Sequence, residues 1–258
     1  MTTVIAIHST RGGVGKTRLA VNLALAYARQ GHNVALIDLD FRAPSLSKII
    51  PVQPRTLYMN DFLDGHVSIG DVLVDVTPTY HTDGRLLVGL IDASLDAIRT
   101  MASKDRRWEM NALRRLMAMK GELAATGVDY VIFDTSPGVL YSSVNAVACA
   151  DLVVVVTTAD TLALKETQWV ITELYTAFDK PTYVLLNKVI PAFHYDELTK
   201  TKLAKQFTSL FSAPILSIVP CYCDLLNSRT TIHTLEHPDH PFSQAVYDIA
   251  HTLATHKP

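Results

Sequence analysis

Cysteine is scarce in this chain of 258 residues, which contains only Cys149, Cys221 and Cys223. Three cysteines are too few for a disulfide framework, which favours a reducing, cytoplasmic environment. Hydrophobic runs are also short, and none approaches the ~20 apolar residues that a membrane-spanning helix requires. The first residues lead directly into an apolar run and lack the basic segment and cleavage site of a secretion signal. We therefore expect a soluble, cytoplasmic protein.

No charge of either sign predominates. Charged residues make up 19% of the chain and the net charge is −2, which argues against nucleic-acid binding through overall basicity. Hydrophobic residues make up 48%, enough for a chain of this length to bury a full core. Because no repeat or low-complexity linker interrupts the sequence, we expect a single domain over residues 1–258. Residues 51–82 are the least regular part and are interpreted as an insertion.

Short β-branched runs alternate with longer helical patterns along the chain. Strands are expected at residues 4–8, 33–38, 85–90, 130–134, 152–157, 182–187 and 215–219. Helices are expected at residues 17–30, 103–126, 162–178, 196–211 and 242–255. Nearly continuous apolar strands are typical of parallel sheets that helices cover on both sides. The sequence therefore predicts an α/β fold with a doubly wound, mainly parallel sheet of about seven to eight strands and helices on both faces.

The strongest motif is the segment Arg11-Gly12-Gly13-Val14-Gly15-Lys16-Thr17, which lies between the first predicted strand and the first predicted helix. Glycines permit a tight turn whose N–H groups point at phosphate oxygens, and the helix adds the positive end of its dipole. Lys16 is expected to reach the β- and γ-phosphates, and the Thr17 hydroxyl to bind Mg²⁺. The general phosphate-loop pattern begins with glycine at the position where this chain has Thr10.

Polar residues end three of the predicted strands. Asp38 and Asp40 close the second strand, and Asp134 closes the fourth. The carboxyl ends of parallel strands border the ligand crevice of an open α/β sheet, so Asp134 is expected to hold Mg²⁺ directly or through water. Asn187 ends a later strand, and its amide offers the donor and acceptor that suit an adenine edge. These residues extend the predicted phosphate site to a complete nucleotide site.

The segment from Arg11 to Thr17 resembles the deviant Walker A motif of the ParA/MinD-type ATPases, usually Lys-Gly-Gly-x-Gly-Lys-Thr/Ser. That family tolerates a residue other than glycine at the Thr10 position, and the resemblance extends over most of the chain. It implies a P-loop NTPase that binds ATP/ADP and Mg²⁺ and hydrolyses ATP slowly, with stimulation by a partner. Such proteins act as switches that position or regulate a partner or cargo.

The resemblance also implies roles for individual residues. The counterpart of Asp40 positions or activates the attacking water, the counterpart of Asp38 supports the Mg²⁺ site, and the Gly138 amide senses the γ-phosphate. Catalysis is assigned to Lys16, Asp40 and Arg11, and Mg²⁺ binding to Thr17, Asp38 and Asp134. The expected nucleotide contacts are Gly12, Gly13, Val14, Gly15, Lys16, Thr17, Arg18, Gly138, Asn187, Pro220 and Cys221.

Arg11 is the position at which this chain departs from its apparent relatives. In the family, the first lysine of the motif reaches across a face-to-face homodimer to the ATP of the partner. Arginine keeps the positive charge and adds a planar fork of donors, so a contact to phosphate in trans remains available to it. We expect a homodimer that forms on ATP binding, with Arg11 completing the second site. The alternative is that Arg11 is a solvent-facing loop residue.

Cysteines and histidines near the end of the chain suggest a different class of function. Cys221 and Cys223 follow the last predicted strand, and His233, His237 and His240 come soon after. Thiolates and imidazoles are good ligands for Zn²⁺, although this spacing does not match the usual zinc-finger pattern. One alternative is therefore a metal-handling or iron–sulfur-type chaperone that uses Cys221 and Cys223. Another is a nucleotide-binding regulator with little turnover.

A basic amphipathic pattern precedes the fourth strand. Its positive residues are Lys104, Arg106, Arg107, Arg114, Arg115 and Lys120. This pattern indicates a surface helix, and a second interpretation is a surface for DNA phosphates or a protein partner. MinD-type members end in a basic amphipathic helix that binds membrane. Residues 242–258 contain one lysine and no basic face, so we expect a packing helix rather than a stable membrane anchor.

Overall fold

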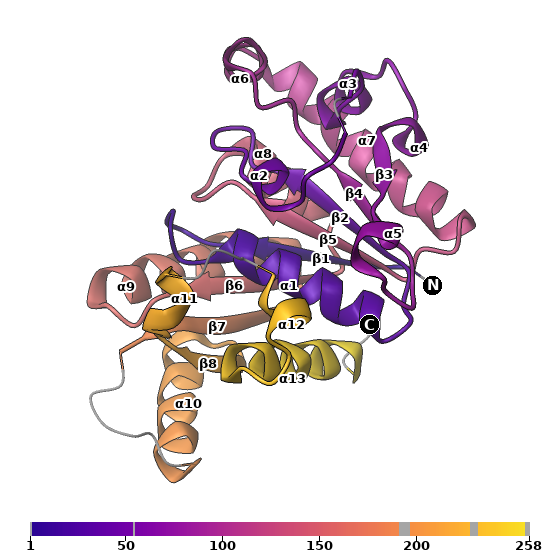
Figure 1. Ribbon diagram of the computed structural model, residues 1–258. Coiled ribbons are helices and arrows are strands. Elements are labelled where there is room, and N and C mark those ends of the chain that lie inside the picture. Colours follow the sequence, from indigo (N-terminus) through magenta and orange to yellow (C-terminus); the bar gives the residue numbers. More distant parts are fainter. Residues whose placement is uncertain (1, 54, 191–196, 228–231, 256–258) are drawn as a thin grey trace.

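The centre of the molecule is an eight-stranded sheet with the strand order β3-β4-β2-β5-β1-β6-β7-β8 (Figure 1). The computed structural model describes residues 2–53, 55–190, 197–227 and 232–255. The strands are β1 (Thr3–His8), β2 (Val34–Leu39), β3 (Leu73–Asp75), β4 (Leu86–Gly89), β5 (Tyr130–Thr135), β6 (Leu152–Thr157), β7 (Thr182–Val189) and β8 (Ile215–Pro220). Neighbouring strands run parallel except β3, which is antiparallel to β4. The predicted mainly parallel sheet is confirmed.

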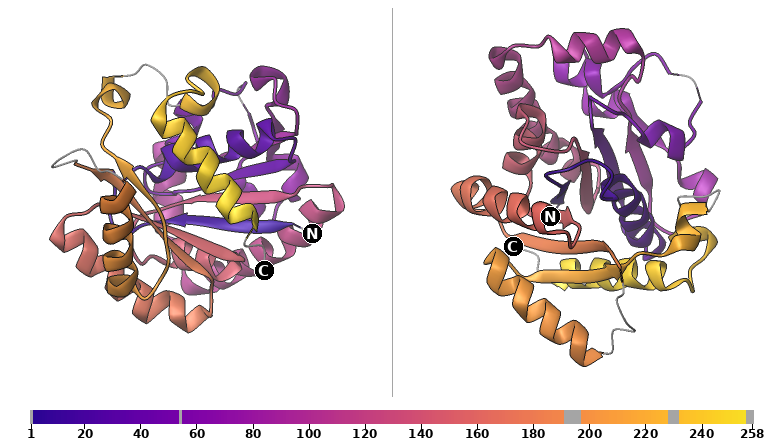
Figure 2. Two further views of the ribbon diagram at one scale, coloured as in Figure 1. Left: turned by 90° about the horizontal axis from the view of Figure 1, so that it is seen from below. Right: turned by 90° about the vertical axis from the view of Figure 1, so that its left-hand side faces the viewer.

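Helices cover both faces of this sheet. One face carries α1 (Lys16–Arg29), α12 (His233–Glu236) and α13 (Pro241–Thr255), and the other carries α7 (Arg106–Ala125), α8 (Tyr141–Cys149), α9 (Thr161–Val170) and α10 (Glu197–Phe211) (Figures 1 and 2). The remaining helices are α2 (Leu46–Ile49), α3 (Met59–Asp64), α4 (Ile69–Val72), α5 (Thr77–Tyr80), α6 (Leu95–Ala102) and α11 (Cys223–Asn227). The doubly wound arrangement is therefore as predicted.

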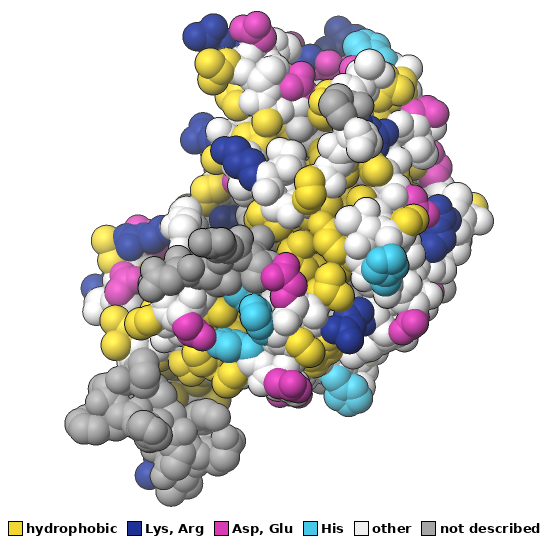
Figure 3. Space-filling model, viewed as in Figure 1, with side chains coloured by type: hydrophobic (Ala, Val, Ile, Leu, Met, Phe, Trp, Pro, Cys, Tyr) yellow, Lys and Arg dark blue, Asp and Glu magenta, His cyan; other side chains and the backbone are white. Residues whose placement is uncertain are grey.

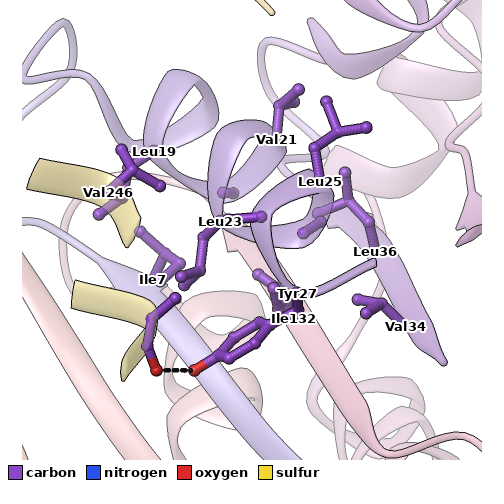
Figure 4. Close-up of a cluster of buried hydrophobic side chains, with 14 of the residues drawn as sticks. Ile7, Leu19, Val21, Leu23, Leu25, Tyr27, Val34, Leu36, Ile132 and Val246 are labelled. Carbon is purple, nitrogen blue, oxygen red and sulfur yellow. Dashed lines mark hydrogen bonds between the residues drawn. The ribbon is translucent and has the colours of Figure 1, made fainter. Parts of the chain in front are cut away.

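Strand residues supply the core to both faces in alternation. Ile5 and Ile7 of β1 pack on the side of α1, whereas Val4 and Ala6 pack on the side of α7 and α8. Figure 4 shows the α1 side, where the Tyr27 hydroxyl donates a hydrogen bond of 3.1 Å to the carbonyl of Ala250. This bond joins the first helix to the last one. Burial on both faces explains why the strands are nearly continuous apolar runs.

Two regions differ from the sequence prediction. Residues 51–82, predicted to be the least regular part, contain α3, α4, α5 and the edge strand β3. These elements are three to six residues long, too short to produce a helical or alternating period. The helix predicted at 162–178 is α9 followed by a π-helical turn (Ile171–Tyr175) and a 3₁₀ turn (Thr176–Phe178). No described helix is long and apolar enough to cross a membrane.

Gly84, in the turn before β4, packs closely against the turn that follows α1. A Cβ atom on Gly84 would lie 2.1 Å from the carbonyl oxygen of His32, which is backbone and cannot rotate away. We predict that Gly84→Ala lowers the free energy of unfolding by about 1–3 kcal/mol. Gly121→Ala is the matched control, because a Cβ atom there meets nothing within 4 Å in α7 and should stabilise the helix. Urea unfolding of both variants measures the difference. Equal stability of the two variants would contradict the packing.

Candidate functional site

The glycine-rich loop between β1 and α1 is fastened to the end of β7. Asn187 donates from Nδ2 to the carbonyl of Val14 at 2.7 Å, and Lys188 donates from Nζ to the carbonyl of Gly13 at 2.6 Å. Gly15 has φ of 104°, and a Cβ atom there would lie 2.5 Å from Asn187 Nδ2. Only glycine combines that backbone angle with this close approach. Because two loop carbonyls are occupied in this way, the loop has a defined shape.

Lys16 begins α1 and is almost fully buried, with 6% of its surface exposed. Its ammonium donates to Ser9 Oγ at 2.8 Å, and that hydroxyl donates to the Arg11 carbonyl at 2.6 Å. Burial lowers the pKa of Lys16, and the carboxylates of Asp134 and Asp40 oppose the shift. The ammonium of Lys16 thus lies at the start of a helix and is held by a hydrogen bond to one neutral hydroxyl. The helix dipole and the lysine charge attract the same anion there.

Two buried carboxylates lie next to this lysine. Asp38 at the end of β2 stands in register with Asp134 at the end of β5, and each is 1% exposed. Burial raises the pKa of Asp134 to about 7, while the Thr17 hydroxyl and Lys16 oppose the rise. Burial and then the charge of Asp134 raise the pKa of Asp38 well above its usual value. Neither oxygen of Asp134 has a hydrogen-bond partner among the described residues. A buried, unpartnered carboxylate beside a hydroxyl fits a hard cation such as Mg²⁺.

Asp40 lies at the wall of the site and is held by donors from two loops. Its Oδ1 accepts from the Ser136 hydroxyl at 2.9 Å and from the backbone N–H groups of Arg42 and Ala43 at 3.3 and 3.2 Å. Its own N–H donates to Asp38 Oδ1 at 2.9 Å. These bonds connect the loop after β2 to the loop after β5. The carboxylate is therefore fixed in position although it is not part of a strand.

The loop and these side chains open on one cavity of about 490 Å³. Of the residues predicted to contact nucleotide or act in catalysis, it is lined by Gly12, Gly13, Gly15, Lys16, Thr17, Arg18, Asp40, Asn187, Pro220 and Cys221. Val14, Gly138 and Arg11 do not line it, nor do Asp38 and Asp134 behind it. The prediction missed the lining residues Arg42, Ala43, Ser45, Pro137, Lys188, Tyr222, Leu225 and Phe242.

Gly138, in the loop after β5, is held by groups that the sequence prediction missed. Its N–H donates to the carbonyl of Ser9 at 2.8 Å, and its carbonyl accepts from Ser143 Oγ at 2.7 Å and from His8 Nε2 at 3.0 Å. Since a carbonyl only accepts, His8 carries its proton on Nε2, and Nδ1 accepts from the hydroxyl of Tyr175. Burial lowers the pKa of His8 to about 4, so the ring is neutral. No sequence motif marks His8 or Tyr175.

Arg11 is not among the residues that line the cavity. Its guanidinium bonds to Glu166 of α9, and these bonds raise its pKa. The exposed fraction of its side chain is 34%, so it is not a freely solvated loop residue. Glu166 was another residue that no sequence motif singles out.

The cysteines and histidines at the end of the chain do not form a ready metal site. Cys221 lines the cavity and Cys223 is exposed. Histidine side chains gather beside α12 on the face shown in Figure 3. Within the described ranges no group of three or more histidine, cysteine or acidic side chains is placed to hold a metal ion. Among the described residues of one chain, Cys221 and Cys223 are therefore not joined by a third metal ligand.

Two of the six basic residues of the predicted surface helix form ion pairs with other parts of the molecule. Lys104 pairs with Asp64 at 2.7 Å, and Lys120 pairs with Asp151 at 2.5 Å. Asp151 also accepts from the N–H of Val4 at 2.8 Å, so Lys120 secures the start of β1. Lys104, just before α7, and Lys120, within α7, thus serve packing, whereas Arg106, Arg107 and Arg114 are exposed.

Comparison with known proteins agrees with this geometry. Residues 2–183 match a family model described as an AAA domain. The chain is 30% identical over 234 residues to the septum site-determining protein MinD of Thermotoga maritima, covering 90% of this chain and 80% of the relative. It is 28% identical over 170 residues to an iron–sulfur cluster carrier protein of Pyrococcus abyssi, covering 63% of this chain and 54% of that relative.

Solved structures share the fold. The structure of the septum site-determining protein MinD of Pyrococcus horikoshii, determined with Mg-ADP, superposes with a TM-score of 0.75 at 19% identity. The match covers 98% of this chain and 96% of that one. The predicted P-loop NTPase fold is thereby confirmed.

His8 provides a pH test of the site. Its folded pKa of about 4 lies below its ordinary value of 6.5, so the unfolded chain binds the proton first as the pH falls. Neutral His8 therefore contributes its full share to the free energy of unfolding above pH 6.5, and this contribution is lost as the pH falls from 6.5 to 4. We predict that the wild-type free energy of unfolding falls by roughly 1–2 kcal/mol more than that of His8→Gln between pH 7 and 5. Urea unfolding at several pH values measures this. His251→Gln, an exposed histidine in α13, should follow the wild type; parallel curves for His8→Gln and wild type would contradict the assignment.

Proposed function

Because the chain belongs to the ParA/MinD-type P-loop ATPases, we propose that it is a Mg²⁺-dependent switch that binds ATP, dimerises and hydrolyses ATP slowly to position or regulate a partner. One observation carries the proposal: the glycine loop, Lys16, Asp40 and Asn187 border a single cavity at the carboxyl ends of the strands. Phosphate-binding, water-positioning and base-binding groups are then within reach of one nucleotide.

Nucleotide binding uses groups that are already in place. The loop presents backbone N–H groups at the start of α1, and its carbonyls are held by Asn187 and Lys188. Lys16 exchanges its bond to Ser9 Oγ for bonds to phosphate oxygens. Asn187 uses one N–H on Val14, which leaves a second N–H and the carbonyl oxygen for adenine. Pro220 and Cys221, together with Tyr222 and Phe242, form the wall for the base.

Thr17, Asp38 and Asp134 would hold the magnesium ion. Mg²⁺ would neutralise charge that develops on the β- and γ-phosphates. The two buried carboxylates support this assignment, because each is desolvated and Asp134 has no hydrogen-bond partner among the described residues. A cation removes the cost of ionising them. Thr17, at the start of α1, places its hydroxyl next to the Asp134 carboxylate. The same hydroxyl accepts a hydrogen bond of 3.4 Å from Ser45.

Asp40 is the residue we assign to the attacking water. The donors Ser136, Arg42 and Ala43 fix its Oδ1, so the carboxylate has a constant place at the cavity wall. Gly138 would report the γ-phosphate by moving its N–H from the Ser9 carbonyl to a phosphate oxygen. Arg11 would bind the phosphates of a second copy in trans, where a guanidinium suits phosphate better than an ammonium does.

The Mg²⁺ assignment is tested with Asp134→Asn. The variant keeps the shape of the side chain and removes its charge. We expect wild-type protein to bind a fluorescent ATP analogue more tightly with Mg²⁺ than with EDTA, and Asp134→Asn to lose about 10–100-fold of that Mg²⁺-dependent gain. Asp83→Asn, an exposed aspartate, is the control and should retain the gain. An unchanged Mg²⁺ dependence in Asp134→Asn would remove this residue from the metal site.

The switch mechanism is tested with Asp40→Ala. We expect phosphate release to fall by about 10²–10⁴-fold, as for loss of a group that aligns or activates water, while ATP affinity persists. ATP-bound dimer should therefore accumulate in light-scattering measurements, and ADP should return the protein to monomer.

Two outcomes would contradict this mechanism. If the mass is the same in ATP and in ADP, the proposed ATP-dependent dimerisation is wrong. If wild-type phosphate release is at background, the chain is a nucleotide-binding regulator without turnover. The locked Asp40→Ala form is also the bait for identifying the partner.

A further inference from the structure

The side chain of Arg11 is held by α9. Its Nε and Nη2 atoms donate to Oε2 and Oε1 of Glu166 at 2.6 and 3.0 Å, and its Nη1 lies 3.5 Å from Asp160 Oδ1. Two parallel bonds between planar groups fix both the position and the direction of a guanidinium. A lysine ammonium is a point donor and cannot form this fork. The arginine at position 11 and the carboxylate at position 166 are therefore matched to each other.

The backbone carbonyl of Arg11 is also held by a hydrogen bond, in addition to the contacts of the side chain. The Arg11 carbonyl accepts from Ser9 Oγ, which in turn accepts from Lys16 Nζ. The side chains of Arg11 and Glu166 are 34% and 40% exposed. Because water reaches both groups, breaking the ion pair leaves no unpaired charge buried in the interior. Exposed pairs of this kind change an equilibrium by only a few-fold, so the contact can direct Arg11 and still release it.

We infer that Glu166 is a positioning residue that holds Arg11 in cis on α9, and that ATP-dependent dimerisation requires Arg11 to leave Glu166 for the phosphates of the second copy. The inference rests on the trans role proposed above for Arg11. A triphosphate carries several negative charges and offers more acceptors than one carboxylate, so it can displace Glu166. Asp160 stays in place when Arg11 leaves, because its Oδ1 also accepts the N–H of Ala163 at 3.0 Å and caps α9.

The test is Glu166→Gln, which keeps the size of the side chain and removes its charge. Dimer formation is measured by light scattering against the concentration of a non-hydrolysable ATP analogue with Mg²⁺. We expect the half-maximal concentration to fall about two- to fivefold, the range of a lost exposed ion pair. ADP affinity of the monomer should not change. Glu173→Gln, an exposed glutamate farther along the same helical run, is the matched control.

The double variant Arg11→Ala/Glu166→Gln separates positioning from a structural effect. If Glu166 acts through Arg11, the substitution at 166 changes nothing when residue 11 is alanine. A persistent effect, or no fall in the half-maximal concentration for Glu166→Gln, would overturn the inference while leaving the proposed function intact. If Arg11→Ala alone neither weakens dimerisation nor slows turnover, the proposed trans role of Arg11 fails instead.

Discussion

The site depends on one constraint of the sheet: the register of β2 and β5 sets Asp38 directly opposite Asp134. Both carboxylates are buried, and each raises the cost of ionising the other. A protein selected for stability alone would place apolar residues at these two positions. Lys16 lies next to the pair and its positive charge offsets part of this cost. On the assignment proposed above, a bound Mg²⁺ ion would offset the rest, so the register of two strands would set the metal site.

The same sheet also positions the phosphate loop. In the ladder between β1 and β5, Ile7 stands in register with Asp134, so the chain leaves β1 for the loop one residue beyond the carboxylates. Across the sheet, β7 ends with two side chains that bind the carbonyls of Gly13 and Val14. Backbone acceptors of the loop are thereby satisfied within the protein. Its N–H groups can then be directed at a ligand, which a freely turning glycine segment would not achieve.

The parts of this structure that the sequence predicts are those with a local cause. Seven strands follow from apolar runs, and the phosphate loop follows from glycine spacing between a strand and a helix. Strand β3 and the short helices α3–α5 lack any period, since three to six residues do not complete one. Side chains brought to the site from distant positions have no local signal either. Tyr222 and Phe242 reach the cavity, and Tyr175 reaches His8, only because the β6–β8 half of the sheet folds against α1 and β1.

Both loops that would respond to nucleotide are attached to one helical run through single side chains. The phosphate loop is attached through Arg11 to Glu166 in α9, and the loop after β5 is attached at Gly138 through His8 to Tyr175. Tyr175 closes a π-helical turn, a rare geometry that is frequently found at functional sites. His8 and Tyr175 are buried, whereas the Arg11–Glu166 pair is open to water. The two attachments therefore differ in strength, and Arg11 can be released while the buried contact still holds the loop after β5.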